Sequence, residues 1–149
     1  VVTLGPREYE ERRVAAGNIN KLLGEINVQI LGELEDEVEL FVVDEFARAA
    51  RSYIQAGVPK GVRLVVRPRA EDDAAVAAAS ILARSRYLEE MDRLSEAVGF
   101  ELPRGATHVI GAARRLVRER GEEALKDAAK IHFATTEKVL GGAGSRRGS

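Results

Sequence analysis

The sequence predicts an α/β fold in which a helix joins two parallel strands. Two short apolar runs, at residues 40–43 and 62–66, are rich in valine and too short for helices, so each is predicted to be a strand. The segment between them has helical character and ends in the turn-forming residues 57–61. Such a strand, helix and strand form one right-handed crossover, so both strands end at the same edge of the sheet.

Two helices are predicted before the first strand. Pro6 suits the first turn of a short helix that reaches about Val14, and Gly17 then interrupts it. Asn18 is a typical N-cap for the second helix. Apolar residues recur there every three or four positions, which turns one stripe toward a core. The stripe contains Ile19, Leu22, Leu23, Ile26, Ile30 and Leu34.

The strand at 40–43 is continuously apolar and is therefore predicted to be central and buried on both faces. A helix from Glu45 to about Ala56 should follow it, and a long helix over residues 72–99 should follow the second strand. The apolar stripe of that long helix contains Val76, Ala79, Ala83, Tyr87, Met91, Leu94 and Val98.

The carboxyl-terminal part is predicted to be helical. Thr107 is a plausible cap for a helix that Gly121 ends, and a further helix is expected over about residues 122–130. Residues 141–149 are rich in Gly, Ser and Arg, so we expect a disordered tail after a domain of residues 1–140.

Composition limits the class of protein. With 149 residues, 45% hydrophobic and 32% charged, the chain suits one soluble domain or most of one. It has no cysteine, so a metal would need oxygen or imidazole ligands. No apolar run approaches the roughly 20 residues that span a bilayer, so we expect a cytoplasmic protein without a membrane partner. The first residue is Val1 and the sole methionine is Met91, so we expect a piece of a longer protein.

Acidic residues follow both predicted strands. Asp44 comes directly after the first, and Glu71, Asp72 and Asp73 follow the second. In α/β folds this edge of the sheet is where chemistry is placed, and carboxylates are the ligands that Mg²⁺ prefers. Two other interpretations remain open, because Asp often caps a helix and acids are favoured in a helix's first turn.

Several segments, in order, resemble bacterial ribonuclease HIII. They are residues 18–23, 43–47, 69–71, 76–84, 102–106 and 132–138, and the resemblance covers residues 6–140. It implies a partial ribonuclease H-like fold, the carboxyl-terminal part of a catalytic domain, without an organic cofactor. The implied enzyme cuts the RNA strand of RNA/DNA hybrids with two Mg²⁺ or Mn²⁺ ions, held by four acids.

Within this resemblance, Asp44 matches the third acid and Glu71 the fourth. The spacing from Glu71 to Ser80 is one residue shorter than the family pattern, which leaves Asp72 as a competing ligand. Nothing matches the adjacent Asp-Glu pair of the family's first strand, so we expect little catalysis by these 149 residues alone.

Substrate contacts are expected from amide, hydroxyl and basic side chains, which position a nucleic-acid backbone. The candidates are Asn20, Lys21, Ser80, Arg84 and Arg104. For Ser80, packing of a small residue on the sheet is the favoured explanation over a substrate contact. Residues 103–149 carry 10 basic against 5 acidic residues, which could form either phosphate contacts or a solvated face. The alternative function is a non-catalytic nucleic-acid-binding or interaction module derived from the same fold.

Overall fold

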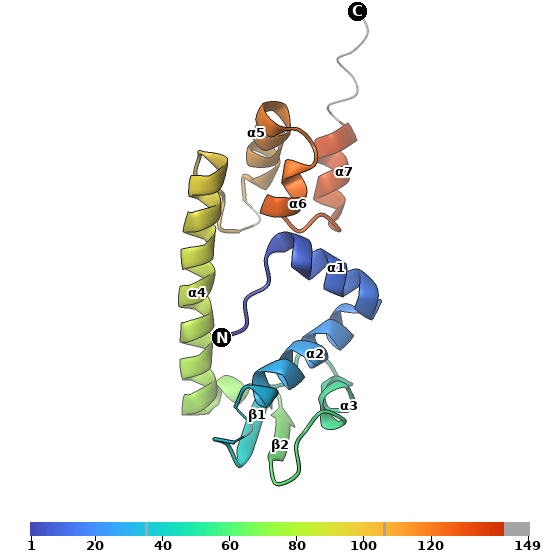
Figure 1. Ribbon diagram of the computed structural model, residues 1–149, viewed down its shortest axis with the longest axis vertical. Coiled ribbons are helices and arrows are strands. Elements are labelled where there is room, and N and C mark those ends of the chain that lie inside the picture. Colours follow the sequence, from blue (N-terminus) through green and yellow to red (C-terminus); the bar gives the residue numbers. More distant parts are fainter. Residues whose placement is uncertain (35, 106, 142–149) are drawn as a thin grey trace, which may run out of the picture. The chain divides into compact units, whose positions relative to one another are not determined.

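The computed structural model describes residues 1–34, 36–105 and 107–141. The chain divides into two compact units, of which the first contains Val1–Thr3 and Arg12–Arg86 and the second contains residues 4–11 and those from Tyr87 onward. Helices α1 (Pro6–Ala16) and α4 (Ala74–Val98) contribute residues to both units (Figure 1). Most of the predicted tail, residues 142–149, lies outside the described residues.

The sheet of the first unit confirms the predicted crossover. Strands β1 (Leu40–Asp44) and β2 (Arg63–Arg67) pair in parallel, with Asp44 opposite Arg67. The ladder continues for one more bond, because the Glu45 N–H donates to the Arg67 carbonyl at 3.0 Å. The α/β class and the parallel strand–helix–strand unit are thus as predicted, and both strands end at the same edge.

Two details of this crossover differ from prediction. Strand β1 is not buried on both faces, since Val43 is its sole buried residue and Leu40 is 43% exposed. Nor is it central, since within the described residues the sheet has two strands and β2 is the neighbour of β1. Helix α3 (Ala50–Gln55) is also shorter than expected. Residues 45–49 form turns instead, in which the Phe46 N–H donates to the Asp44 carbonyl at 2.9 Å.

Helix α2 (Ile19–Gly32) packs on α3 and builds the core of the first unit. Asn18 caps it as predicted, and its side chain accepts the Asn20 N–H at 2.8 Å. Two glycines allow the helices to approach, because a Cβ at Gly24 would overlap Tyr53 and a Cβ at Gly57 would overlap Val28. The buried cluster next to the sheet contains Val43, Ile54 and Leu64.

A short 3-10 turn, η1 (Ala70–Asp72), separates β2 from α4. The predicted long helix therefore begins two residues late, at Ala74. Asp73 is its cap, with the Asp73 Oδ1 accepting the Ala75 N–H at 2.9 Å. No residue of α4 is buried. The apolar stripe predicted on it was partly wrong, since Ala79, Ala83 and Tyr87 are exposed.

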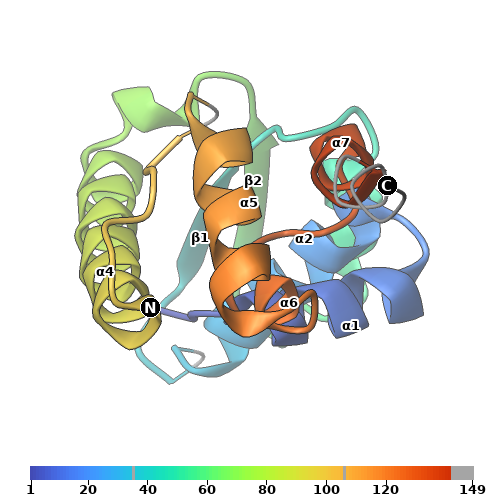
Figure 2. The same cartoon turned by 90° about the horizontal axis from the view of Figure 1, so that it is seen from above.

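The second unit has a helical core of its own. Helix α5 (Val109–Arg120) contacts both α6 (Ala124–Ala128) and α7 (Ala134–Gly141) (Figures 1 and 2). Gly121 ends α5 as predicted. The predicted cap was wrong, because His108 occupies the N-cap with φ 64° and makes no side-chain cap bond. The buried residues of this core are Leu116, Leu125 and Val139.

Among the helices of the described residues, none combines the length and the apolar character that crossing a bilayer requires.

Candidate functional site

The candidate site is an acidic rim, formed by Asp44, Glu71 and Asp72 at the carboxyl edge of the sheet. Asp44 is the last residue of β1, and its Oδ1 accepts the backbone N–H of Ala70 at 3.0 Å. Glu71 is the next residue after Ala70, within η1. A single hydrogen bond therefore joins the turn that carries Glu71 and Asp72 to the side chain of Asp44.

The three rim carboxylates have no basic partner within the described residues. Each of them is exposed, and none forms an ion pair there. Asp73 differs from them, because its carboxylate is used to cap α4. Glu71 and Asp72 both lie in η1, so the competition between them as ligands stays open. The rim therefore offers exposed carboxylates that form no ion pair in the described part of the chain.

An unusual backbone conformation supports the rim. Arg69 lies in the left-handed region, with φ 52° and ψ 43°. The guanidinium of Arg67 donates to the Arg69 carbonyl at 3.4 Å, and the Asp72 N–H donates to the same carbonyl at 3.3 Å. The turn was missed by the sequence reasoning. Pro68 could have indicated it, because a proline at the second position of a turn often precedes a residue of positive φ.

The rim suits a hard divalent cation in donor type, since carboxylate oxygens are the ligands of Mg²⁺ and Mn²⁺. It is a partial ligand set. Within the described residues, no group of three or more His, Asp or Glu side chains is placed to hold a metal ion. Asp44 and either Glu71 or Asp72 are the residues of this chain that could contribute ligands.

The predicted substrate-binding residues are spread over several elements. Asn20 and Lys21 lie in the first turn of α2, and Ser80 and Arg84 lie exposed on α4, all in the first unit. Ser80 is exposed, which does not favour packing on the sheet. Arg104 belongs to the second unit, where it forms an ion pair with Asp92.

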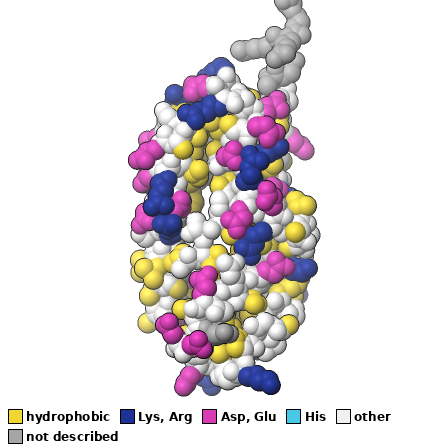
Figure 3. Space-filling view, in the orientation of Figure 1, with side chains coloured by type: hydrophobic (Ala, Val, Ile, Leu, Met, Phe, Trp, Pro, Cys, Tyr) yellow, Lys and Arg dark blue, Asp and Glu magenta, His cyan; other side chains and the backbone are white. Residues whose placement is uncertain are grey.

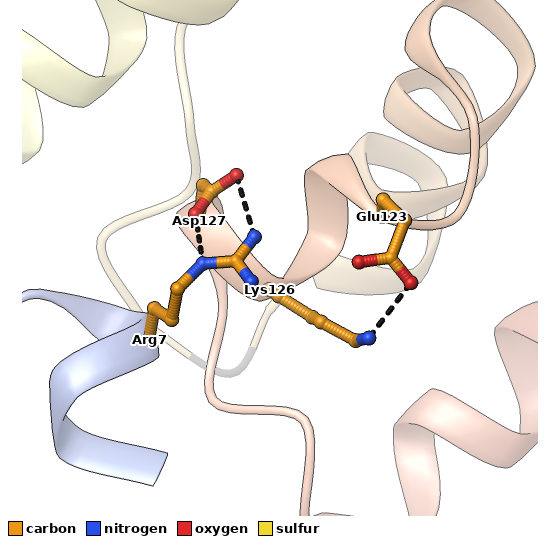
Figure 4. Close-up of polar contacts among 4 residues, drawn as sticks. All are labelled: Arg7, Glu123, Lys126 and Asp127. Carbon is orange, nitrogen blue, oxygen red and sulfur yellow. Dashed lines mark hydrogen bonds and ion pairs between the residues drawn. The ribbon is translucent and has the colours of Figure 1, made fainter. Parts of the chain in front are cut away.

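Basic residues of the carboxyl-terminal third are mostly engaged in contacts inside the second unit. Arg115 pairs with Glu119 at 2.8 Å, and Lys126 pairs with Glu123 at 2.7 Å (Figure 4). Arg114 donates to the carbonyl of Lys138 at 3.2 Å. These contacts favour the solvated structural face over the phosphate-binding one.

Comparisons with known proteins agree with this architecture. The family model described as Ribonuclease HII matches residues 3–136. Ribonuclease HIII of Geobacillus kaustophilus is 38% identical over 151 residues, which cover 94% of this chain and 48% of that protein. Ribonuclease HIII of Chlamydia pneumoniae is 33% identical over 148 residues, covering 95% of this chain and 50% of that protein.

Solved structures give the same result. A mutant protein of Bst-RNase HIII matches with a TM-score of 0.83 and 36% identity, over 97% of this chain and 50% of that one. Bst-RNase HIII in complex with Mn²⁺ matches with a TM-score of 0.81 and 37% identity, at the same coverage. The chain spans about half the length of the curated relatives it matches. The resemblance seen in the sequence is confirmed, and the chain belongs to the ribonuclease HII family, with ribonucleases HIII among its relatives.

Proposed function

We propose that this chain is the carboxyl-terminal part of a ribonuclease HIII that cleaves the RNA strand of RNA/DNA hybrids endonucleolytically. One observation carries the proposal: parallel strands bring Asp44 and the turn with Glu71 to one edge, joined by the 3.0 Å bond from Ala70 to Asp44. Membership of the family supports it. Mg²⁺ or Mn²⁺ is the proposed cofactor, and the Mn²⁺ complex of the structural neighbour supports that choice.

In this proposal, Asp44 and Glu71 hold the divalent cations, with Asp72 as the competitor of Glu71. Bound divalent cations supply Lewis-acid stabilisation of charge during phosphoryl displacement. The Ala70 N–H fixes one oxygen of Asp44, so the carboxylate is oriented before substrate arrives. Among the described residues the rim has no basic partner, so the carboxylate charge is available to cations.

Substrate binding is proposed for Asn20, Lys21, Ser80, Arg84 and Arg104, through contacts to the sugar-phosphate backbone. Lys21 is exposed on the first turn of α2, and Ser80 is exposed on α4. These residues position a hybrid without reading its sequence. Arg104 would have to exchange its ion pair with Asp92 for a phosphate.

A second candidate function is a non-catalytic module that binds nucleic acid or another protein. The observation that favours it for the chain alone is the partial ligand set, with no triad of possible metal ligands among the described residues. The two candidates differ in one measurable property, which is metal-dependent cleavage once the rest of the domain is supplied.

The test is a chimera in which this chain replaces its counterpart in the Geobacillus kaustophilus enzyme. A labelled RNA/DNA hybrid is incubated with Mg²⁺ or Mn²⁺, beside the 149-residue chain alone. The chimera should cleave, and the isolated chain should cleave little or not at all. Asp44→Asn should lower the cleavage rate by at least about 100-fold, because altering even outer-shell partners of a metal ligand costs roughly 10- to 100-fold.

Glu39→Gln is the matched control, because Glu39 is an exposed acid just before the opposite end of β1. It should leave the rate within about twofold, since a surface change away from the site has little effect. Circular dichroism checks that each variant folds. A folded chimera that retains near-normal cleavage with Asp44→Asn would refute the role of Asp44, and a folded chimera without cleavage would favour the binding module.

A further inference from the structure

Arg69 combines an unfavourable backbone conformation with a side chain that the fold does not use. Its φ of 52° lies in the left-handed region, which residues other than Gly, Asn and Asp rarely adopt. Within the described residues, its guanidinium makes no hydrogen bond or ion pair. A glycine would hold the same turn without strain, so stability does not explain an arginine here.

The turn itself is held by other groups. Arg67 donates to the carbonyl of Arg69 at 3.4 Å, and the next N–H, that of Ala70, donates to Asp44 at 3.0 Å. The turn therefore depends on the backbone of Arg69, and in the described part of the chain its side chain contributes no hydrogen bond to it. Residues in sparsely populated conformations gather at functional sites, where the surrounding structure holds them in place.

The guanidinium of Arg69 belongs to a residue beside the acidic rim, which suggests a ligand for it. Arg69 stands two residues before Glu71 and next to the N–H that orients Asp44, at the acidic rim. Although Glu71 and Asp72 are near in sequence, Arg69 pairs with neither of them. Arginine is suited to a phosphate, since its planar donors bind phosphate oxygens in pairs.

We propose that Arg69 is a substrate-positioning residue whose guanidinium contacts a backbone phosphate of the bound RNA/DNA hybrid beside the acidic rim. This inference rests on the proposed function. The phosphate contact would bring the hybrid to the edge where Asp44 and Glu71 lie. The positive charge of Arg69 would also offset the repulsion between the rim carboxylates and the polyanionic hybrid. Such a contact positions nucleic acid and carries no sequence information.

The test measures binding of a fluorescein-labelled RNA/DNA hybrid to the full 149-residue chain by anisotropy, with Mg²⁺, over a series of KCl concentrations. Arg69→Gln should weaken binding roughly 3- to 10-fold. It should also lower the slope of log K against log salt by about 0.9, the value for one phosphate contact. Arg69→Lys should keep the salt slope, because the charge remains.

Two further variants separate charge from conformation. Arg69→Gly should bind as weakly as Arg69→Gln although its urea unfolding midpoint is not lowered, because glycine accepts the positive φ. Arg63→Gln is the matched control, since Arg63 is an exposed arginine at the opposite end of β2. It should change neither affinity nor slope beyond about twofold.

The outcomes distinguish this inference from the function on which it rests. If the wild-type chain binds the hybrid and the Arg69 variants bind equally well with the same salt slope, the role of Arg69 is overturned and the proposed substrate stands. An equal loss with Arg63→Gln would also overturn it, because net charge alone would then explain the effect. If the wild-type chain does not bind the hybrid, this inference fails, and cleavage of the hybrid by the chimera then decides separately whether the proposed substrate stands.

Discussion

The charged side chains of the second unit and those of the acidic rim in the first unit differ in their partners. In the second unit, acids and bases are paired: Arg7 with Asp127 at 2.7 Å, and His132 with Glu10 at 3.0 Å (Figure 4 shows the first pair). Dark blue and magenta side chains also lie side by side over the upper part of the face drawn in Figure 3. At the acidic rim of the first unit, Asp44, Glu71 and Asp72 have no basic partner among the described residues.

The difference gives a criterion for proposing which charges are structural and which are functional. Exposed ion pairs contribute little to stability, but each charge in a pair is already neutralised by its partner. Carboxylates held at one sheet edge without such partners keep their charge available for a cation. The hydrogen bond from Ala70 to Asp44 orients a carboxylate without neutralising it, which is the arrangement that a metal ligand requires.

The largest expected effect concerns the choice between Glu71 and Asp72. In the chimera with the Geobacillus kaustophilus enzyme, Glu71→Gln should lower the rate of hybrid cleavage by at least about 100-fold, because it removes a cation ligand. Asp72→Asn should lower it by less than about 10-fold, because an exposed acid that holds no cation is an ordinary surface position. The reverse order in the same assay would assign the ligand to Asp72.

Core substitutions test whether the two units, which are distinct in their contacts, also unfold independently of each other. Ile54 and Leu116 are 0% and 1% exposed, one in each unit. Ile54→Ala and Leu116→Ala should each lower the free energy of unfolding by about 2 to 5 kcal/mol, through lost burial and a cavity. Urea denaturation measures the change.

Hydrogen exchange then locates the effect of each core substitution. Ile54→Ala should speed exchange of the β1 amides more than Leu116→Ala does, because Ile54 packs in the cluster that contains Val43 and Leu64. Equal acceleration by both variants would mean that the two units unfold together and are not separate in stability.

The fold was predictable where local sequence decides the structure. The valine-rich runs and the turn residues between them predicted a parallel pair, and Asn18 predicted its helix cap. Burial was not predictable in the same way. The apolar run at β1 predicted a central strand, but Leu40 is exposed, because burial depends on the neighbours of a strand and not on its own residues.

The location of the candidate acids was predictable, but the turn and the hydrogen bond that hold them were not. Asp44 and Glu71 were expected at one edge, because parallel strands end together. The turn at Arg69 and the bond from Ala70 to Asp44 were not expected, since both depend on a backbone conformation that arginine rarely adopts. The roles of Asp44 and Glu71, and of the substrate-binding candidates, remain predictions.

The smallest expected effect belongs to a paired charge of the second unit. A hydrogen bond from Arg7 lowers the pKa of Asp127 below its ordinary 3.8. The folded chain therefore holds this proton less tightly than the unfolded chain, so the pair favours folding above about pH 3.8, and this contribution is lost as the pH falls through the lowered pKa.

Asp127→Asn should accordingly lower the urea midpoint slightly at pH 7 and have no effect well below pH 3.8. The reason is that protonation of the wild-type carboxyl removes the same interaction. Midpoints of both proteins over a pH series measure it. A gap between the two proteins that widens as the pH falls would contradict this sign.

The most direct test of the acidic rim uses Mn²⁺ as a paramagnetic probe of the 149-residue chain. Substoichiometric Mn²⁺ is added and the amide signals are followed by nuclear magnetic resonance, with Asp44→Asn as the comparison. Signals of residues 44–45 and 69–72 should broaden first, and Asp44→Asn should remove that preference. Broadening that begins at other acidic segments, or that is unchanged by Asp44→Asn, would contradict a cation site at this edge of the sheet.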